Sequence, residues 1–199
     1  MKESIVGEAL ARTFFERGPD EVARELLGTL LVVRDGASAK VAMIAETEAY
    51  GGLSDPASHA FRGRTKRSAI MFGPAGHLYV YLIYGVHWCV NIVTETTDQP
   101  SAVLLRGATL LSDEGRGDTD GTPLRGPGNL TKGLAITGAD NGLDCCSPKG
   151  RISLHRSLTD QSALIIDTSV RIGLSVAKDR VSRYFLRGSP AVSRLPRSK

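Results

Sequence analysis

The most strand-like stretch of the chain is LYVYLIYGVHWCVNIVT, residues 78–94. Its β-branched and aromatic residues are interrupted only around Gly85, which predicts a β-hairpin with its tip near Tyr84, Gly85 and Val86. Alternation along the first strand places Tyr79, Tyr81 and Ile83 on one face and Val80, Leu82 and Tyr84 on the other. The hairpin therefore favours a sheet with mainly antiparallel pairing.

The rest of the chain supplies short elements around this hairpin. Helical segments are expected at residues 19–28, 68–72 and 130–136. Strands are expected at residues 29–33, 40–50, 102–106, 152–154 and 170–174. Residues 112–129 are rich in glycine and proline and are predicted to form a mobile surface loop. These elements predict one mixed α/β domain over residues 1–199, a length that suits a single core.

Charge and aromatic residues are distributed unevenly. The 199 residues carry 25 basic and 21 acidic side chains, a net charge of +4, and the composition is that of an ordinary globular protein. Residues 1–60 have a net charge of −4 and the remainder has +8, while seven of the eleven aromatic residues lie between Tyr50 and Trp88. A basic body around an aromatic-rich segment is typical of nucleic-acid binders, although aromatic residues also fill cores.

The sequence argues against a membrane or secreted protein. No run of 18 apolar residues is present, and residues 1–16 lack the apolar centre of a signal peptide. The three cysteines, Cys89, Cys145 and Cys146, form an odd number without a disulfide framework. We therefore expect a cytoplasmic location.

Two glutamates on one predicted strand are the first candidates for chemistry. If residues 40–50 are fully extended, Glu46, Glu48 and Tyr50 share a face with Ala42 and Ile44. Two carboxylates and a tyrosine suit a general base beside an aromatic stacking surface. Alternatively, one glutamate is exposed and the other pairs with an arginine.

Two further polar positions also have two interpretations each. Tyr84, beside the glycine at the hairpin tip, is either a wedge between base pairs or a half-buried turn residue that covers the sheet edge. Asn91 lies inside an apolar run, where its amide either braces a turn or faces a pocket.

A metal site is not expected. The spacing of His59, His77, His87 and Cys89 matches no tetrahedral zinc pattern. The basic side chains between residues 62 and 67 suit either phosphate contacts or simple solvation. They are Arg62, Arg64, Lys66 and Arg67.

Several motifs together resemble the alkyladenine (3-methyladenine) DNA glycosylase family, over residues of about 10 to 195. The motifs are AETEAY (45–50), His59, MFGPAGHLYVYLIYG (71–85), CVN (89–91), VLLR (103–106), RIG (171–173) and RYFLRGSP (183–190). The resemblance implies a single domain with a curved, mainly antiparallel sheet from which the tyrosine hairpin protrudes.

The resemblance also implies roles for individual residues. Glu48 would be the general base that activates the attacking water, and Arg106 would help to place that water and Glu48. Tyr84 would fill the gap left in the duplex. The pocket for the extruded base would be formed by Tyr50, His59, Tyr81 and Asn91. Which of Glu46 and Glu48 is the base follows only from alignment to Tyr50, since both share a face.

The function implied is a monofunctional glycosylase of base excision repair. It would flip out alkylated or deaminated purines of the 3-methyladenine, 7-methylguanine or hypoxanthine type and hydrolyse the N-glycosidic bond. The expected partner is double-stranded DNA containing a damaged purine, with no cofactor, no obligatory protein partner and a monomeric state. Two other classes remain open: a non-catalytic nucleic-acid-binding module and a small-molecule nucleoside hydrolase.

Overall fold

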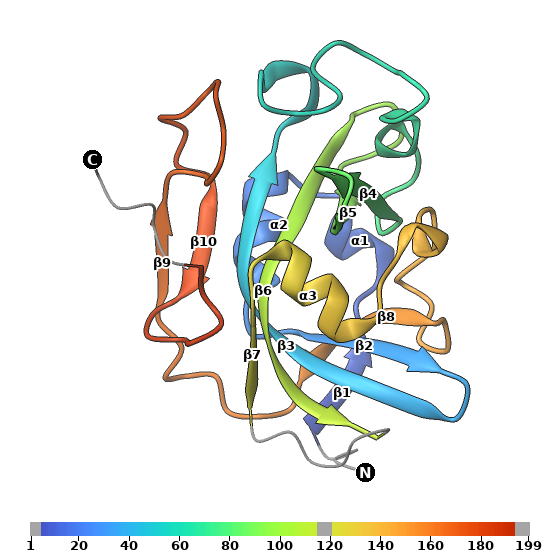
Figure 1. Ribbon diagram of the computed structural model, residues 1–199, viewed down its shortest axis with the longest axis vertical. Coiled ribbons are helices and arrows are strands. Elements are labelled where there is room, and N and C mark those ends of the chain that lie inside the picture. Colours follow the sequence, from blue (N-terminus) through green and yellow to red (C-terminus); the bar gives the residue numbers. More distant parts are fainter. Residues whose placement is uncertain (1–4, 115–120, 194–199) are drawn as a thin grey trace.

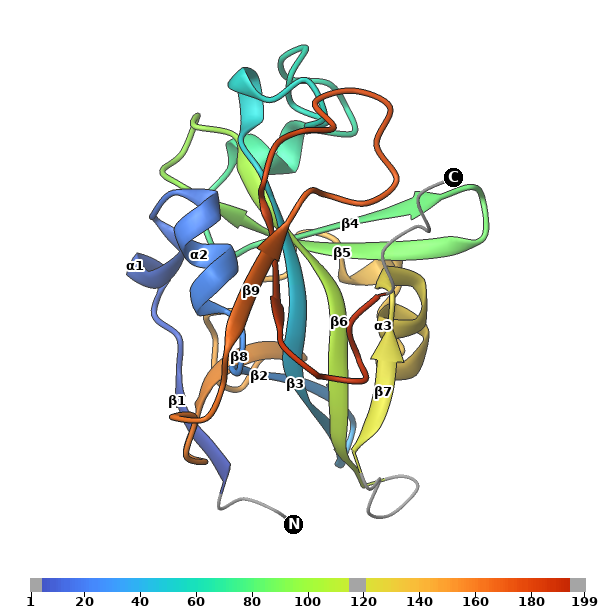
Figure 2. The ribbon, with the colours of Figure 1, turned by 90° about the vertical axis from the view of Figure 1, so that its left-hand side faces the viewer.

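The predicted hairpin is formed by β4 (Leu78–Ile83) and β5 (His87–Thr94), which pair antiparallel with Ile83 opposite His87. Its tip turns through Tyr84 and Gly85, whose φ angles of 53° and 71° lie in the left-handed region. Glycine adopts this region without steric cost, and it lets the chain reverse within a few residues. Figure 2 shows the hairpin extending away from the rest of the sheet.

The computed structural model describes residues 5–114 and 121–193. Within these residues the other strands are β1 (Val6–Ala9), β2 (Leu30–Asp35), β3 (Ser38–Tyr50), β6 (Ser101–Asp113), β7 (Thr122–Arg125), β8 (Ile152–Ser157), β9 (Ile166–Ser169) and β10 (Arg183–Leu186). The helices are α1 (Arg12–Phe15), α2 (Pro19–Glu25) and α3 (Pro127–Leu134), with single 3₁₀ turns at Gly52–Ser54, Ala69–Phe72 and Gly138–Asp140.

One antiparallel sheet organises these elements (Figure 1). Its main path runs β1-β8-β2-β3-β6-β5-β4, with β7 added to β6 and the β9–β10 pair added to β3. The long strands β3 and β6 form the centre, and apolar residues of β2, β3, β5 and β6 pack with α2 and α3 into one core. The predicted fold class, a mixed α/β protein with a mainly antiparallel sheet, is confirmed.

Two local predictions are wrong. Part of the loop expected over residues 112–129 is regular: β7 pairs with β6, and α3 begins at Pro127, whose fixed φ suits a first helical turn. Residues 115–120 lie outside the described part of the chain. The strand expected near 170–174 is instead β9 at Ile166–Ser169, because side-chain and amide contacts of Arg171 and Ile172 hold residues 170–174 at the site described below.

No helix in the described ranges is both long enough and apolar enough to cross a membrane.

A glycine on β6 lets the C-terminal segment pack against the sheet. A Cβ atom at Gly107 would lie 2.3 Å from the carbonyl oxygen of Ala191, a separation that real Cβ atoms do not show. We predict that Gly107→Ala lowers the free energy of unfolding by about 1–3 kcal/mol through overpacking. Urea unfolding measures it, with Gly18→Ala as the control, since nothing lies within 4 Å of a Cβ there. Equal stability of Gly107→Ala and the wild type would contradict the close packing.

Candidate active site

Two buried carboxylates share one guanidinium at the centre of the sheet. Glu46 and Glu48 of β3 are fully buried, and the Nε atom of Arg106 on β6 lies 3.1 Å from Glu46 Oε1 and 3.4 Å from Glu48 Oε1. The β3–β6 register shifts on both sides of Glu46, and such irregularities re-aim side chains next to functional sites. The prediction that Glu46, Glu48 and Tyr50 lie together is confirmed, whereas Ile44, before the shift, belongs to the apolar core.

The partners of Glu46 favour its ionised form. Its Oε1 atom accepts a hydrogen bond of 2.7 Å from Nε of the buried Arg183, and its Oε2 atom accepts one of 2.7 Å from the amide of Ser193. Burial alone would raise the pKa of Glu46, but the Ser193 amide, Arg106 and Arg183 outweigh it and hold this pKa below its ordinary value. Glu46 is therefore the structural carboxylate of the pair.

Glu48 is compensated less completely. Its Oε1 atom accepts a hydrogen bond of 2.7 Å from the amide of Ile172, and its Oε2 atom accepts one of 2.8 Å from the hydroxyl of Tyr50. Burial nevertheless raises the pKa of Glu48 above its ordinary value, against Arg106 and these two donors. Carboxylates whose environments move their pKa values apart are typical of acid–base sites.

A cavity of about 250 Å³ lies next to the partners of Glu48, although Glu48 itself is not part of its lining. The residues around this carboxylate, namely Tyr50, Arg106 and Ile172, all line the cavity. Six residues were predicted for the base pocket and the catalytic centre, and five of them are in its lining: Tyr50, His59, Tyr81, Asn91 and Arg106. The sixth, Glu48, lies behind the lining and is hydrogen-bonded to the hydroxyl of Tyr50.

The aromatic wall of the cavity is uncharged at neutral pH. His59 accepts or donates a hydrogen bond of 2.8 Å between Nδ1 and the Tyr79 hydroxyl, and its ring packs edge-on against Tyr81 at 4.7 Å between centroids. Burial and the charge of Arg67 lower the pKa of His59 to about 4. A neutral imidazole and the rings of Tyr79 and Tyr81 thus line this side of the cavity.

Asn91 lines the pocket, as one of its two interpretations predicted, and its amide braces the β4–β5 strand pair instead of a turn. Its Nδ2 atom donates a hydrogen bond of 2.9 Å to the carbonyl of Tyr79, the residue opposite it in the hairpin, and the side chain also lines the cavity. The interpretation of Tyr84 as a half-buried turn residue is wrong, because Tyr84 is 85% exposed and does not cover the sheet edge.

The basic run forms an exposed rim. Its exposed side chains are Arg62, Arg64, Lys66 and Arg67. Arg64 pairs with Asp98 at 2.6 Å, and the guanidinium of Arg67 lies 4.8 Å from the centroid of the Tyr81 ring. Arg67 therefore contacts the Tyr81 ring of the cavity wall, although it is not part of the cavity lining.

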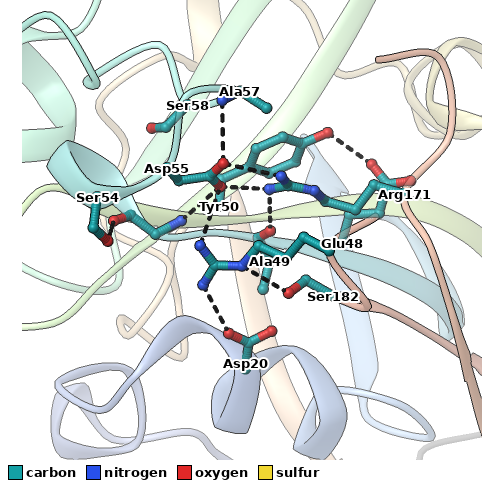
Figure 3. A network of polar contacts seen from close by, with 12 residues as sticks. Asp20, Glu48, Ala49, Tyr50, Ser54, Asp55, Ala57, Ser58, Arg171 and Ser182 are labelled. Carbon is teal, nitrogen blue, oxygen red and sulfur yellow. Dashed lines mark hydrogen bonds and ion pairs between the residues drawn. The ribbon is translucent and has the colours of Figure 1, made fainter. Parts of the chain in front are cut away.

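Sequence reasoning assigned no role to a buried ion pair beside the site, drawn in Figure 3. Asp55 and Arg171 are both buried, and Arg171 also contacts Tyr50. The sequence did contain a signal for Arg171, because this residue lies in a motif of the family resemblance. The same is true of Arg183, the partner of Glu46.

The geometry joins a buried carboxylate to an aromatic cavity in a chain with a protruding tyrosine hairpin. The family model described as methylpurine-DNA glycosylase matches residues 13–190. The chain belongs to the methylpurine-DNA glycosylase family.

Curated relatives agree with membership of the methylpurine-DNA glycosylase family. One from Rickettsia felis is 43% identical over 88% of this chain and 91% of its own length. Relatives from Anaeromyxobacter dehalogenans and Myxococcus xanthus are 45% and 42% identical, over 94% of this chain and 86% and 94% of theirs. All three carry the name "Putative 3-methyladenine DNA glycosylase". The predicted family is confirmed, and with it the prediction of a hydrolase that acts on N-glycosyl bonds.

Replacing the two glutamates by glutamine should have different effects on the free energy of unfolding. Glu46→Gln should lower the free energy of unfolding by about 3–5 kcal/mol, because it leaves buried guanidinium charge unpaired. Glu48→Gln should keep or raise stability at pH 7. The folded-state pKa of Glu48 lies above the unfolded value, so the wild type loses stability as pH rises through that interval, and glutamine removes this loss.

Urea unfolding at pH 7 and near pH 4 tests this. Any gain in the free energy of unfolding of Glu48→Gln over the wild type should disappear at the lower pH, where the carboxyl of the wild type is protonated in the folded state. A loss in Glu48→Gln as large as that in Glu46→Gln would contradict the division of roles.

Proposed function

We propose that the protein is a monofunctional DNA glycosylase that extrudes alkylated or deaminated purines from duplex DNA and hydrolyses their N-glycosidic bond. The observation that carries this proposal is the placement of Glu48, a buried carboxylate with a raised pKa, directly behind Tyr50, Arg106 and Ile172, which line an aromatic cavity. Family membership supports the same reaction class. No step in the proposal uses a cofactor.

Glu48 acts as the general base. It removes a proton from a water molecule as the oxygen forms a bond to C1′ and the C1′–N bond to the base breaks. A raised pKa improves a carboxylate as a proton acceptor near neutral pH. The transition state carries positive charge on the sugar, and the anion of Glu48 stabilises it as the bond breaks. Arg106, in reach of both glutamates, orients this carboxylate.

The cavity selects the base by stacking and by shape. Tyr50, Tyr81 and His59 offer flat surfaces, and stacking on an aromatic ring contributes about 1–3 kcal/mol per base in single-strand binders. Electron-poor or cationic alkylated purines gain more from such surfaces. Asn91, fixed by its bond to Tyr79, bounds the pocket where guanine carries its exocyclic amino group. The substrates we propose are 3-methyladenine, 7-methylguanine and hypoxanthine.

The surface around the cavity suits duplex DNA. Tyr84, at the tip of a two-stranded ribbon, enters the duplex from the minor groove and fills the space left by the extruded nucleotide. The four basic residues of the rim contact the phosphate backbone. We propose that the enzyme works as a monomer in the cytoplasm and needs no protein partner for this step.

Replacing the proposed base should separate binding from chemistry. Glu48→Gln should slow single-turnover release of hypoxanthine or 3-methyladenine from a duplex by at least about a hundredfold, since general bases contribute 10²–10⁴-fold. Duplex affinity should change little. Glu16→Gln, an exposed glutamate outside the cavity, is the matched control. Unchanged release by Glu48→Gln would disprove the mechanism, and a wild type that binds without releasing any base would indicate a binding module.

Removing the proposed wedge should affect duplex substrates only. Tyr84→Ala should slow release from duplex DNA while release from the same sequence in single-stranded form stays near the wild-type rate, because no gap has to be filled there. Val86→Ala removes another exposed side chain, 68% exposed, at the same tip and controls for general damage to the hairpin. Equal losses in the two variants, or no loss in Tyr84→Ala, would contradict the wedge.

A further inference from the structure

A fully buried ion pair joins three segments next to the cavity. Arg171 donates a hydrogen bond of 2.9 Å from Nη2 to Asp55 Oδ1, and its Nη1 atom bonds Asp55 Oδ2. Neither side chain is exposed. Asp55 also accepts the amides of Gly51 and Ala57, which shape the loop that leads from β3 to His59. The pair therefore connects this loop to the segment after β9.

The same guanidinium supports the end of β3. Its Nη1 atom donates a hydrogen bond of 3.0 Å to the carbonyl of Ala49, and its carbon lies 4.6 Å from the centroid of the Tyr50 ring. Tyr50 lines the cavity, whereas the buried Arg171 is not part of the lining. Arg171 thus packs against the ring of a lining residue without lining the cavity itself, and Figure 3 shows the two side chains next to each other.

Stability alone explains this arrangement poorly. A buried ion pair often contributes no more than apolar residues of similar volume, because both charges lose their hydration. Moreover, Nε of Arg171 is buried without a hydrogen-bond partner among the described residues. Such an orphan donor costs free energy and calls for an explanation, and the orientation of the guanidinium over Tyr50 supplies one.

We propose that the Asp55–Arg171 pair positions the Glu48 carboxylate by fixing its two hydrogen-bond donors, the hydroxyl of Tyr50 and the amide of Ile172. Arg171 holds the first by packing against the ring and the second as the adjacent residue in the chain. Asp55 holds Arg171. Both are positioning residues, since neither touches the cavity, and this inference rests on the proposed role of Glu48 as the base.

The consequence is a measurable link between a remote ion pair and the titration of Glu48. Both donors stabilise the carboxylate anion and so lower the pKa of Glu48 against the effect of burial. Loosening them raises this pKa further. The other titratable or charged groups around Glu48 are Glu46 and Tyr50 on β3, Cys89 on β5, Arg106 on β6, Arg171 after β9 and Arg183 on β10.

The experiment compares Arg171→Lys and Asp55→Asn with the wild type. Single-turnover base release from a hypoxanthine duplex is measured from pH 4 to 9 with enzyme in excess. We expect the plateau rate to fall about tenfold or more, because small displacements of a reacting group are costly. The acid limb, where release is lost as Glu48 becomes protonated, should move upward by about one pH unit, the size expected for loss of one hydrogen bond to a charged group.

Asp140→Asn is the matched control. Asp140 is buried, accepts a hydrogen bond of 2.7 Å from Nε of Arg151 and caps a 3₁₀ turn, but it does not line the cavity. Its replacement should lower the melting temperature without moving the acid limb. If the single variants fold poorly, the double variant Asp55→Asn/Arg171→Gln removes both charges together and leaves no unpaired one, and the same shift is expected.

The outcomes separate this inference from the function it rests on. An upward shift in the Asp55 and Arg171 variants, with none in Asp140→Asn, supports positioning. An acid limb that depends on Glu48 but stays in place in all the variants overturns the inference and leaves the glycosylase mechanism intact. Release that persists in Glu48→Gln overturns the proposed function itself.

Discussion

One guanidinium between two buried carboxylates is the constraint on which the site depends. Glu46 and Glu48 are both fully buried on β3, and like charges this close inside a protein are strongly unfavourable without compensation. Arg106 reaches both from β6. One guanidinium cannot neutralise two anions. The chain that follows β9 supplies a second arginine, Arg183, and a backbone amide, and both bind Glu46. Glu48 receives only an uncharged donor, the amide of Ile172, from the chain that follows β9.

Strand alternation gives the two faces of the hairpin different roles. Tyr79 and Tyr81 face the cavity, while Val80 between them packs into the core. The wall of the cavity is therefore carried on a strand whose other face is fixed by apolar packing. At the tip the left-handed turn frees Tyr84 from the alternation and leaves it exposed. One ribbon thus carries a rigid recognition wall and a protruding ring.

The sequence predicts the elements of this fold better than their long-range partners. The hairpin, α2 and the central strands follow from local apolar patterns and turn residues, which are properties of neighbouring positions. The strand expected at 170–174 fails because contacts with Asp55 and Glu48, more than 100 residues away, decide the path of that segment. Similarly, the glycines and prolines of 121–129 indicate a loop, whereas pairing with β6 and a proline at the first helical turn produce β7 and α3.

The choice between Glu46 and Glu48 shows most clearly why part of the site lies beyond sequence reasoning. The two residues are the same type, two positions apart on one strand, so no local property distinguishes them. They differ in the distant partners that the fold brings to them. Glu46 receives Arg183 and the amide of Ser193, whereas Glu48 receives the amide of Ile172, and these partners are 124 to 147 residues away in the chain. A fold that compensated both anions equally would be more stable and would leave neither carboxylate with a raised pKa. The incomplete compensation of Glu48 is therefore a local cost in stability, and it suits this carboxylate to its proposed role as a proton acceptor, the kind of conflict between stability and function expected at an active site.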